Sequence, residues 1–204
     1  MAHDHDHHDH DHDHGHDHDH DHDEDVAQQL RLERAALRRR ALAQIRQYPD
    51  VALRLKAHEV TEFDNDLAKL IARMTELMHD AEGVGLAATQ VGVLRRLFVF
   101  EPEGIGPCAV VNPRLSKQSR DKEIDDEGCL SLQGVRVPVE RATKVTLEGQ
   151  NANGEAVSWE FEGLSARVVQ HELDHLDGIL IFDRADDEHR KQALGILRPQ
   201  PVLG

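Results

Sequence analysis

Hydrophobic residues recur at helical intervals in several parts of the chain. Between residues 64 and 81 they are spaced three and four positions apart, which predicts a helix with one apolar face. A run rich in Arg, Leu and Ala predicts a helix over residues 26–47. A third apolar pattern covers residues 163–176, and a polar segment predicts a surface helix over residues 186–198.

Short apolar runs lie between the second and third helical patterns and are separated by turn residues. They predict strands over residues 96–100, 108–112, 135–139, 144–147 and 156–161. The pair Asn153-Gly154 predicts a hairpin turn. Residues 83–90 are small and interrupted by glycines, so their backbone can approach a ligand or another strand. Helices mixed with hairpin-connected strands indicate the α+β class.

Charge divides the chain at its N-terminus. The whole sequence has a formal net charge of −15, with 39 acidic residues, 24 Lys and Arg, and 16 His. Residues 1–25 contain 11 of the His and 11 of the acidic residues, which leaves 28 acidic against 24 basic side chains in the remainder. This His/Asp-rich tail has no apolar surface to bury, so we expect it to be disordered.

Several classes are disfavoured by the rest of the composition. No apolar run approaches 18 residues, and the N-terminus lacks the basic and apolar regions of a secretory signal, so we expect a cytoplasmic protein without a membrane span. The acidic excess and the few aromatic residues argue against a direct, specific nucleic-acid site. With only Cys108 and Cys129, a disulfide framework is not expected.

The pattern His-Glu-x-x-His lies within the third predicted helix. His171 and His175 are four residues apart and so share one helical face, where both can bind one divalent ion. Glu172 then lies beside the water that such an ion holds. The flanking residues are apolar, and unpaired His and Glu side chains are costly in a buried helix. Both facts favour a metal site over a chance match.

A catalytic site of this kind needs a third protein ligand. The position that a metzincin gives to its third His holds Ile181, and no Glu follows Glu188, as a gluzincin would require. The His-x-Glu and Cys-x-x-Cys patterns of zinc deaminases are also missing. Cys129, next to the flexible Gly128, is the best remaining candidate, whereas Cys108 is interpreted as a small core residue.

Three blocks of this sequence resemble the motifs of bacterial peptide deformylases. They are residues 83–90 (GVGLAATQ), residues 127–131 (EGCLS) and residues 170–175 (QHELDH), in the family's order and with its spacing. The resemblance covers about residues 45–184. It implies a fold with short antiparallel sheets packed around a central metal-binding helix. We therefore expect a tail (1–25), a helical extension (26–44), a catalytic domain (45–184) and a C-terminal helix and tail (185–204).

The resemblance implies a role for each matched residue. Cys129, His171 and His175 would bind one divalent transition metal, Fe²⁺ in the cell, with Zn²⁺, Ni²⁺ or Co²⁺ able to replace it. Glu172 would act as general base and then general acid. The Gln90 side chain and the Leu130 N–H would stabilise the oxyanion that forms.

The implied substrate is an N-formylmethionyl nascent peptide, from which the enzyme hydrolyses the formyl group. Its methionine would occupy an apolar slot with an arginine at the rim. Two further charged residues would lie behind the metal ligands and orient them. The slot residues are Val84, Gly85, Leu130 and Val168; Arg136 is the rim candidate, and Asp174 and Arg141 are the candidates behind the ligands.

Two other functions stay open from the sequence. A metallopeptidase shares the His-Glu-x-x-His pattern, although its usual third ligands are missing. A metal-storage protein or metallochaperone would use the tail, whose imidazoles could bind extra divalent metals. For the deformylase, a transient contact with the ribosome is a further expectation.

Overall fold

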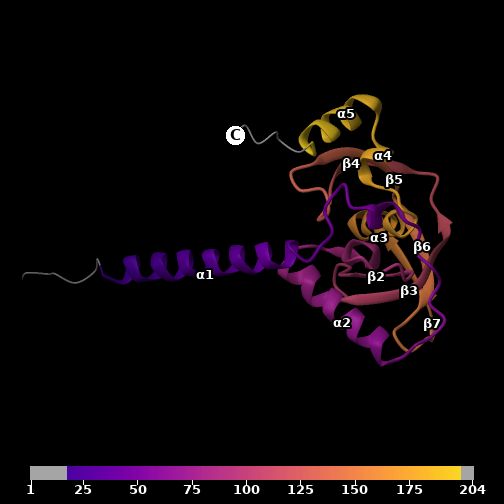
Figure 1. Cartoon of the computed structure of the whole chain (residues 1–204), viewed down its shortest axis with the longest axis horizontal. Coiled ribbons are helices and arrows are strands. Elements are labelled where there is room, and N and C mark those ends of the chain that lie inside the picture. Colours follow the sequence, from indigo (N-terminus) through magenta and orange to yellow (C-terminus); the bar gives the residue numbers. More distant parts are fainter. Residues whose placement is uncertain (1–17, 199–204) are drawn as a thin grey trace, which may run out of the picture. The chain divides into compact units, whose positions relative to one another are not determined.

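The structure, a computed structural model, describes residues 18–198 of the 204-residue chain. The chain divides into two units, one ending at Ala36 and one beginning at Leu37. Helix α1 (His18–Leu42) starts in the first unit and ends in the second (Figure 1). All the other helices and strands belong to the second unit, which also holds the candidate site.

Helix α1 begins and ends earlier than the helix expected over residues 26–47. We expected no regular structure in the His/Asp tail, but residues 18–25 are helical. The first 17 residues lie outside the described residues, so the disorder expected for them stays a prediction.

Helix α2 (Asn65–Asp80) confirms the amphipathic pattern of the sequence. Asp64 caps its N-terminus, since Oδ1 accepts a hydrogen bond of 2.8 Å from the Leu67 N–H. The helix packs against strands β1 (Gly85–Ala87) and β2 (Leu97–Phe100). Its buried residues are Leu67, Met74, Leu77 and Met78.

An antiparallel five-stranded sheet has the order β1-β2-β3-β6-β7. Its other strands are β3 (Cys108–Gln118), β6 (Lys144–Gln150) and β7 (Ala156–Glu162). The predicted hairpin is present between β6 and β7, and Gly154 has a φ of 84° in its turn. Strand β1 was not predicted, because three fully buried residues show no alternation. Within the described residues it pairs only with β2 and forms one edge of the sheet.

Strands β4 (Lys122–Gly128) and β5 (Arg136–Ala142) form a separate two-stranded sheet. Strand β5 confirms and extends the run predicted over residues 135–139. Strand β4 was missed because its sequence is polar and acidic, and six of its seven residues are exposed. Only Glu127 is buried, so β4 lacks the apolar alternation that indicates a strand.

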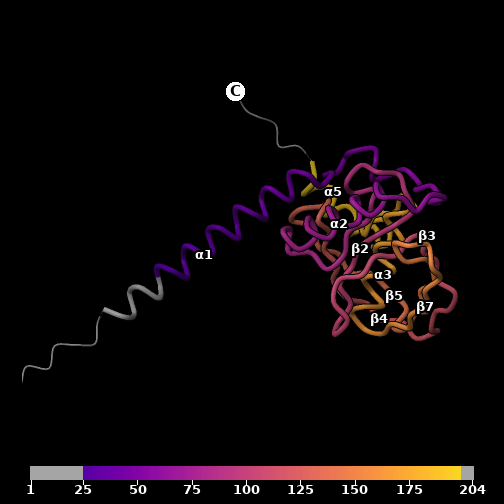
Figure 2. The backbone as a smooth tube through the Cα atoms, turned by 90° about the horizontal axis from the view of Figure 1, so that it is seen from below, coloured from indigo at the N-terminus to yellow at the C-terminus, as the bar shows by residue number. Residues whose placement is uncertain are grey.

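Helix α3 (Gly163–Leu176) lies at the centre of the second unit, as the predicted fold requires. It contacts strands of both sheets and lies between them in two views (Figures 1 and 2). Val169 and Leu176, both fully buried, pack into a core with Phe98 and Phe100 of β2. Burial on nearly all sides explains why the helix can hold polar side chains away from solvent.

Short helices complete the described chain. The 3₁₀ helices are η1 (Val51–Arg54) and η2 (Ala88–Val91). After α3 follow α4 (Ile181–Arg184), which was not predicted, and α5 (Asp187–Ile196), which was. Both pack against β5. No helix in the described range 18–198 is long and apolar enough to cross a membrane.

Candidate metal centre and active site

Three metal-binding side chains meet where the β4–β5 hairpin approaches α3. Cys129 directly follows β4, and His171 and His175 are one turn apart on α3. One ligand atom of each side chain lies within 4.8 Å of the other two, and Cys129 Sγ is 3.2 Å from His175 Nε2. Bond lengths of about 2.0–2.3 Å to a tetrahedral ion require such short separations. A thiolate and two imidazoles suit a divalent transition metal.

Glu127, near the end of β4, orients the first of these histidines. Its Oε2 accepts a hydrogen bond of 2.9 Å from His171 Nδ1, which leaves Nε2 available for an ion. Burial alone would raise the pKa of Glu127, but hydrogen bonds from Arg141 and His171 hold this pKa well below its ordinary range. The carboxylate is therefore charged at neutral pH and fixes the tautomer of the ligand.

Three arginines extend this contact into a charge network that is buried except at Arg184. Arg141 donates to both Glu127 oxygens at 2.9 Å and to Asp174 Oδ2 at 2.6 Å. Arg167 donates to Glu127 Oε1 at 3.0 Å, and Arg184 donates to Asp174 Oδ2 at 3.0 Å. The sequence placed Arg141 and Asp174 behind the ligands, and the structure puts both there. No role was predicted for Glu127, although it lies in the motif of residues 127–131, or for Arg167 and Arg184.

Glu172 lies in the protein interior with an unsatisfied oxygen. Its residue is 4 % exposed, and Oε2 has no hydrogen-bond partner among residues 18–198. Strand β1 packs so closely that a Cβ at Gly85 would lie 2.3 Å from Glu172 Oε1. Burial raises the pKa of Glu172 to about 7. A carboxyl with this pKa can both accept and donate a proton near neutral pH.

Two hydrogen-bond donors lie beside the thiol. Gln90 Oε1 accepts from the Ala87 N–H at 2.8 Å, which turns the amide nitrogen toward Ser131 Oγ at 3.1 Å and Cys129 Sγ at 3.7 Å. The Leu130 N–H, next in sequence to the thiol, donates no hydrogen bond within the described part of the chain. Both donors expected from the sequence are therefore close to the cluster, and the bond from the Ala87 N–H fixes the orientation of the Gln90 amide.

A cleft of about 650 Å³ opens over the cluster. All the expected slot and rim residues line it, namely Val84, Gly85, Leu130, Arg136 and Val168. Val168 is buried, whereas Val84 is half exposed. The sequence missed other lining residues: Arg38, Leu42, Glu82 and Leu164. Leu164, for example, is 63 % exposed on α3. Only the three-dimensional structure shows that this exposed apolar side chain lines the cleft.

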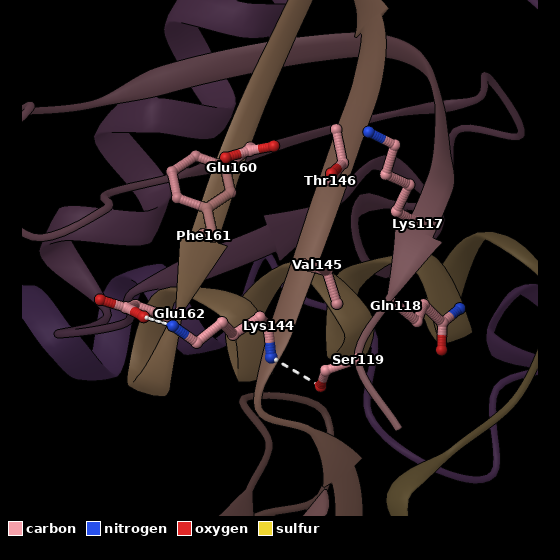
Figure 3. Close-up of a pocket in the computed structure, with 9 residues that line it drawn as sticks. All are labelled: Lys117, Gln118, Ser119, Lys144, Val145, Thr146, Glu160, Phe161 and Glu162. Carbon is pink, nitrogen blue, oxygen red and sulfur yellow. Dashed lines mark hydrogen bonds and ion pairs between the residues drawn. The ribbon is translucent and has the colours of Figure 1, made fainter. Parts of the chain in front are cut away.

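A separate pocket of about 470 Å³ lies over strands β3, β6 and β7 (Figure 3). Its charged side chains come from exposed positions, and Lys144 Nζ forms a 2.6 Å ion pair with Glu162 Oε2. None of the candidate site residues lines this pocket. The chemistry indicated by the sequence belongs to the cleft over the metal-binding cluster.

The second cysteine lies apart from the cluster. Cys108 begins β3, is partly buried and packs against the core around α3. Burial raises the pKa of its thiol. This environment fits the interpretation of Cys108 as a small core residue.

A Cys/His/His cluster beside a buried carboxyl, beneath an open cleft, defines the chain as a metal-dependent hydrolase. Comparison with known proteins specifies the family. The polypeptide deformylase family matches residues 42–191. The chain is 47 % identical to the peptide deformylase of Thermotoga sp. (strain RQ2) over 146 residues, which cover 72 % of this chain and 88 % of the relative.

Two further matches agree in sequence and in structure. The peptide deformylase of Acidothermus cellulolyticus is 47 % identical over 164 residues, covering 80 % of this chain and 90 % of that protein. The crystal structure of the Thermotoga maritima peptide deformylase matches with a TM-score of 0.67 and 47 % identity, covering 70 % of this chain and 96 % of that one. The chain belongs to the polypeptide deformylase family.

Family membership confirms the expected α+β fold and the deformylase interpretation. The enzyme is a metal-dependent hydrolase that removes N-formyl groups. The metallopeptidase and metal-storage alternatives are not favoured.

Proposed function

We propose that Glu172 carries the proton when this enzyme removes the formyl group from N-formylmethionyl nascent peptides. The main support is the buried carboxyl itself, which has an unpartnered oxygen and a pKa of about 7 beside the three metal-binding side chains. Cys129, His171 and His175 would hold the ion. When bound, the ion supplies Lewis acidity, which makes water more acidic and the formyl carbonyl more electrophilic.

The residues of the chain then move the proton and stabilise charge. Glu172 accepts a proton from the attacking water as the water oxygen bonds to the formyl carbon. It returns this proton to the methionine nitrogen as the carbon–nitrogen bond breaks, which releases formate and a free amino terminus. The Gln90 amide and the Leu130 N–H donate to the formyl oxygen as it gains negative charge.

The cleft holds the peptide on both sides of the reacting bond. The methionine side chain lies in the slot formed by Val84, Leu130 and Val168. The peptide backbone lies along β1, where Gly85 permits close approach. Arg136 lies at the rim and contacts residues further along the peptide.

The identity of the ion and the cellular setting complete the proposal. We infer Fe²⁺ in the cell, with Zn²⁺, Ni²⁺ or Co²⁺ able to occupy the same ligands. Because the proposed substrates are nascent chains, the enzyme would act in the cytoplasm, in transient contact with the ribosome. The tail would hold extra divalent metals near the enzyme. Residues 26–44 and 185–204 would flank a catalytic domain over 45–184.

The role of Glu172 is tested with formyl-Met-Ala-Ser and metal analysis of anaerobically purified protein. Glu172→Ala should keep one ion per chain and lose activity by at least about 100-fold, because only the proton carrier is removed. Glu188→Gln, an exposed substitution on α5, is the matched control and should retain wild-type activity. Activity of Glu172→Ala within tenfold of wild type would exclude this role.

The tail has an independent test. Deletion of residues 2–25 should leave activity unchanged with excess metal and reduce it when a chelator limits the free ion. Equal activity of the two forms under metal limitation would exclude the buffering role and leave the catalytic proposal intact.

A further inference from the structure

One cleft residue comes from outside the region that matches the family. That region begins at residue 42, whereas Arg38 lies in the preceding turn of α1 and still lines the cleft. Leu42, which also lines the cleft, is buried in the core with Ala41 and Ile45. The last turns of α1 are therefore anchored, and they bring a guanidinium to the wall of the substrate cleft.

The contacts of Arg38 leave much of its guanidinium available. Nε donates to the Ala81 carbonyl at 3.3 Å and lies 3.5 Å from Glu82 Oε2. The two terminal nitrogens make no hydrogen bond within the described part of the chain. The side chain is 47 % exposed. A guanidinium held at Nε presents its remaining N–H groups as a fork, which matches the two oxygens of a carboxylate.

The Arg38 guanidinium is not already held in a strong ion pair by a neighbouring carboxylate. Glu82 is 49 % exposed and lies 3.5 Å from Nε, and exposed pairs of this kind are weak. The cleft contains two other arginines. Arg136 uses Nη2 to donate to the Asp126 carbonyl at 3.2 Å, and Arg167 uses Nη1 to donate to Glu127 Oε1 at 3.0 Å and Nη2 to donate to the Glu123 carbonyl at 3.0 Å. Arg38 is therefore the cleft arginine with both terminal nitrogens open to a ligand.

We propose that Arg38 is a specificity-determining residue that favours peptides with an acidic side chain downstream of the formylmethionine. This inference rests on the proposed function, because it concerns peptides in the same cleft. Helix α1 thereby adds a substrate contact that residues 42–191, the region matching the family, do not provide alone.

Arg38 also has a structural contact, which the test must separate from recognition. Its bond to the Ala81 carbonyl connects α1 to the C-terminal end of α2 and to the segment that carries Glu82. Loss of this support would weaken the binding of every peptide by the same factor. Loss of recognition would weaken only the binding of acidic peptides.

The experiment therefore compares kcat/KM for isosteric pairs of amidated peptides. The pairs are formyl-Met-Ala-Asp-Ala with formyl-Met-Ala-Asn-Ala, and formyl-Met-Ala-Ala-Asp with formyl-Met-Ala-Ala-Asn. In the wild type, the Asp/Asn ratio should exceed one at one of the two positions and decrease with added salt. Arg38→Gln should lower that ratio by about two- to five-fold, the effect of one exposed ion pair.

Two further variants complete the design. Arg38→Lys keeps the charge and should retain an intermediate ratio. Arg40→Gln removes an exposed charge that does not line the cleft, so its ratio should equal that of the wild type. An Asp/Asn ratio unchanged in Arg38→Gln, or an equal loss for all four peptides, would overturn the proposal. Absence of deformylation in the wild type would instead contradict the proposed function.

Discussion

Substitution of Arg141 tests how much the buried charge network contributes to the free energy of unfolding. The side chains of Arg141 and Glu127 are each 5 % exposed, and that of Asp174 is 10 % exposed. Arg141→Met removes three charge-assisted hydrogen bonds and leaves two buried carboxylates with less compensation. Removing one partner of a buried pair costs about 3–5 kcal/mol. Because Glu127 keeps Arg167 and Asp174 keeps Arg184, we expect the lower value, about 3 kcal/mol of unfolding free energy.

Urea unfolding of the metal-loaded enzyme at pH 7 measures this change. The matched control is Arg114→Met, whose pair with Glu148 is exposed at the arginine (75 %) and should contribute less than about 1 kcal/mol. Metal affinity should also fall by about 10- to 100-fold in Arg141→Met, because Glu127 is held less firmly against His171. A loss of stability no larger than that of the control would refute the reasoning.

Two other predictions address the site and the acid stability of the fold. In the formyl-peptide assay, Gly85→Ala should lose most activity, because the added Cβ would lie 2.3 Å from Glu172 Oε1. The control Gly195→Ala should retain the wild-type rate, because its added Cβ meets no atom within 4 Å. Burial raises the pKa of Asp183, but the hydrogen bonds from Arg54 and from the Leu180 N–H, with the nearby charges of Arg54 and Arg190, together outweigh it, so the folded-state pKa lies below the ordinary value. The stability that this pair contributes is therefore present above about pH 4 and is lost at lower pH. The difference in unfolding free energy between wild type and Asp183→Asn should thus decrease as the pH falls from 6 to 3. A constant difference would contradict the lowered pKa of Asp183.

Apolar patterns of helical length were sufficient to predict α2, which buries one face, and α3, which is buried on nearly all sides. The bounds of α3 agree with the predicted residues 163–176, and α2 differs from its predicted range by one residue at each end. Strands β1 and β4 could not be predicted in this way. One is buried throughout and very short, and the other is almost entirely exposed, so neither alternates between apolar and polar positions.

The candidate site divides along the same line. The spacing of His171, Glu172 and His175 on one helix already implies that they are close together. Cys129, Gln90 and Leu130 lie in other motifs, and only the resemblance to the family linked them to this helix. Glu127 is 44 residues before His171, and Arg38 reaches Ala81 across 43 residues. The first contact depends on how β4 packs with α3 and the second on how α1 packs with α2, which no local pattern encodes.

The ligand set also has a mechanical consequence for the fold. Cys129 follows β4 of the two-stranded sheet, while His171, 42 residues later, lies on a helix packed against the five-stranded sheet. An ion shared by these side chains closes a loop that contains β5, β6 and β7. A covalent link over that length would stabilise a fold by about 4 kcal/mol through the unfolded chain. Removal of the ion by a chelator should therefore speed amide hydrogen exchange in the β4–β5 hairpin first and in β2 only later. The bound ion would thus link the two sheets reversibly.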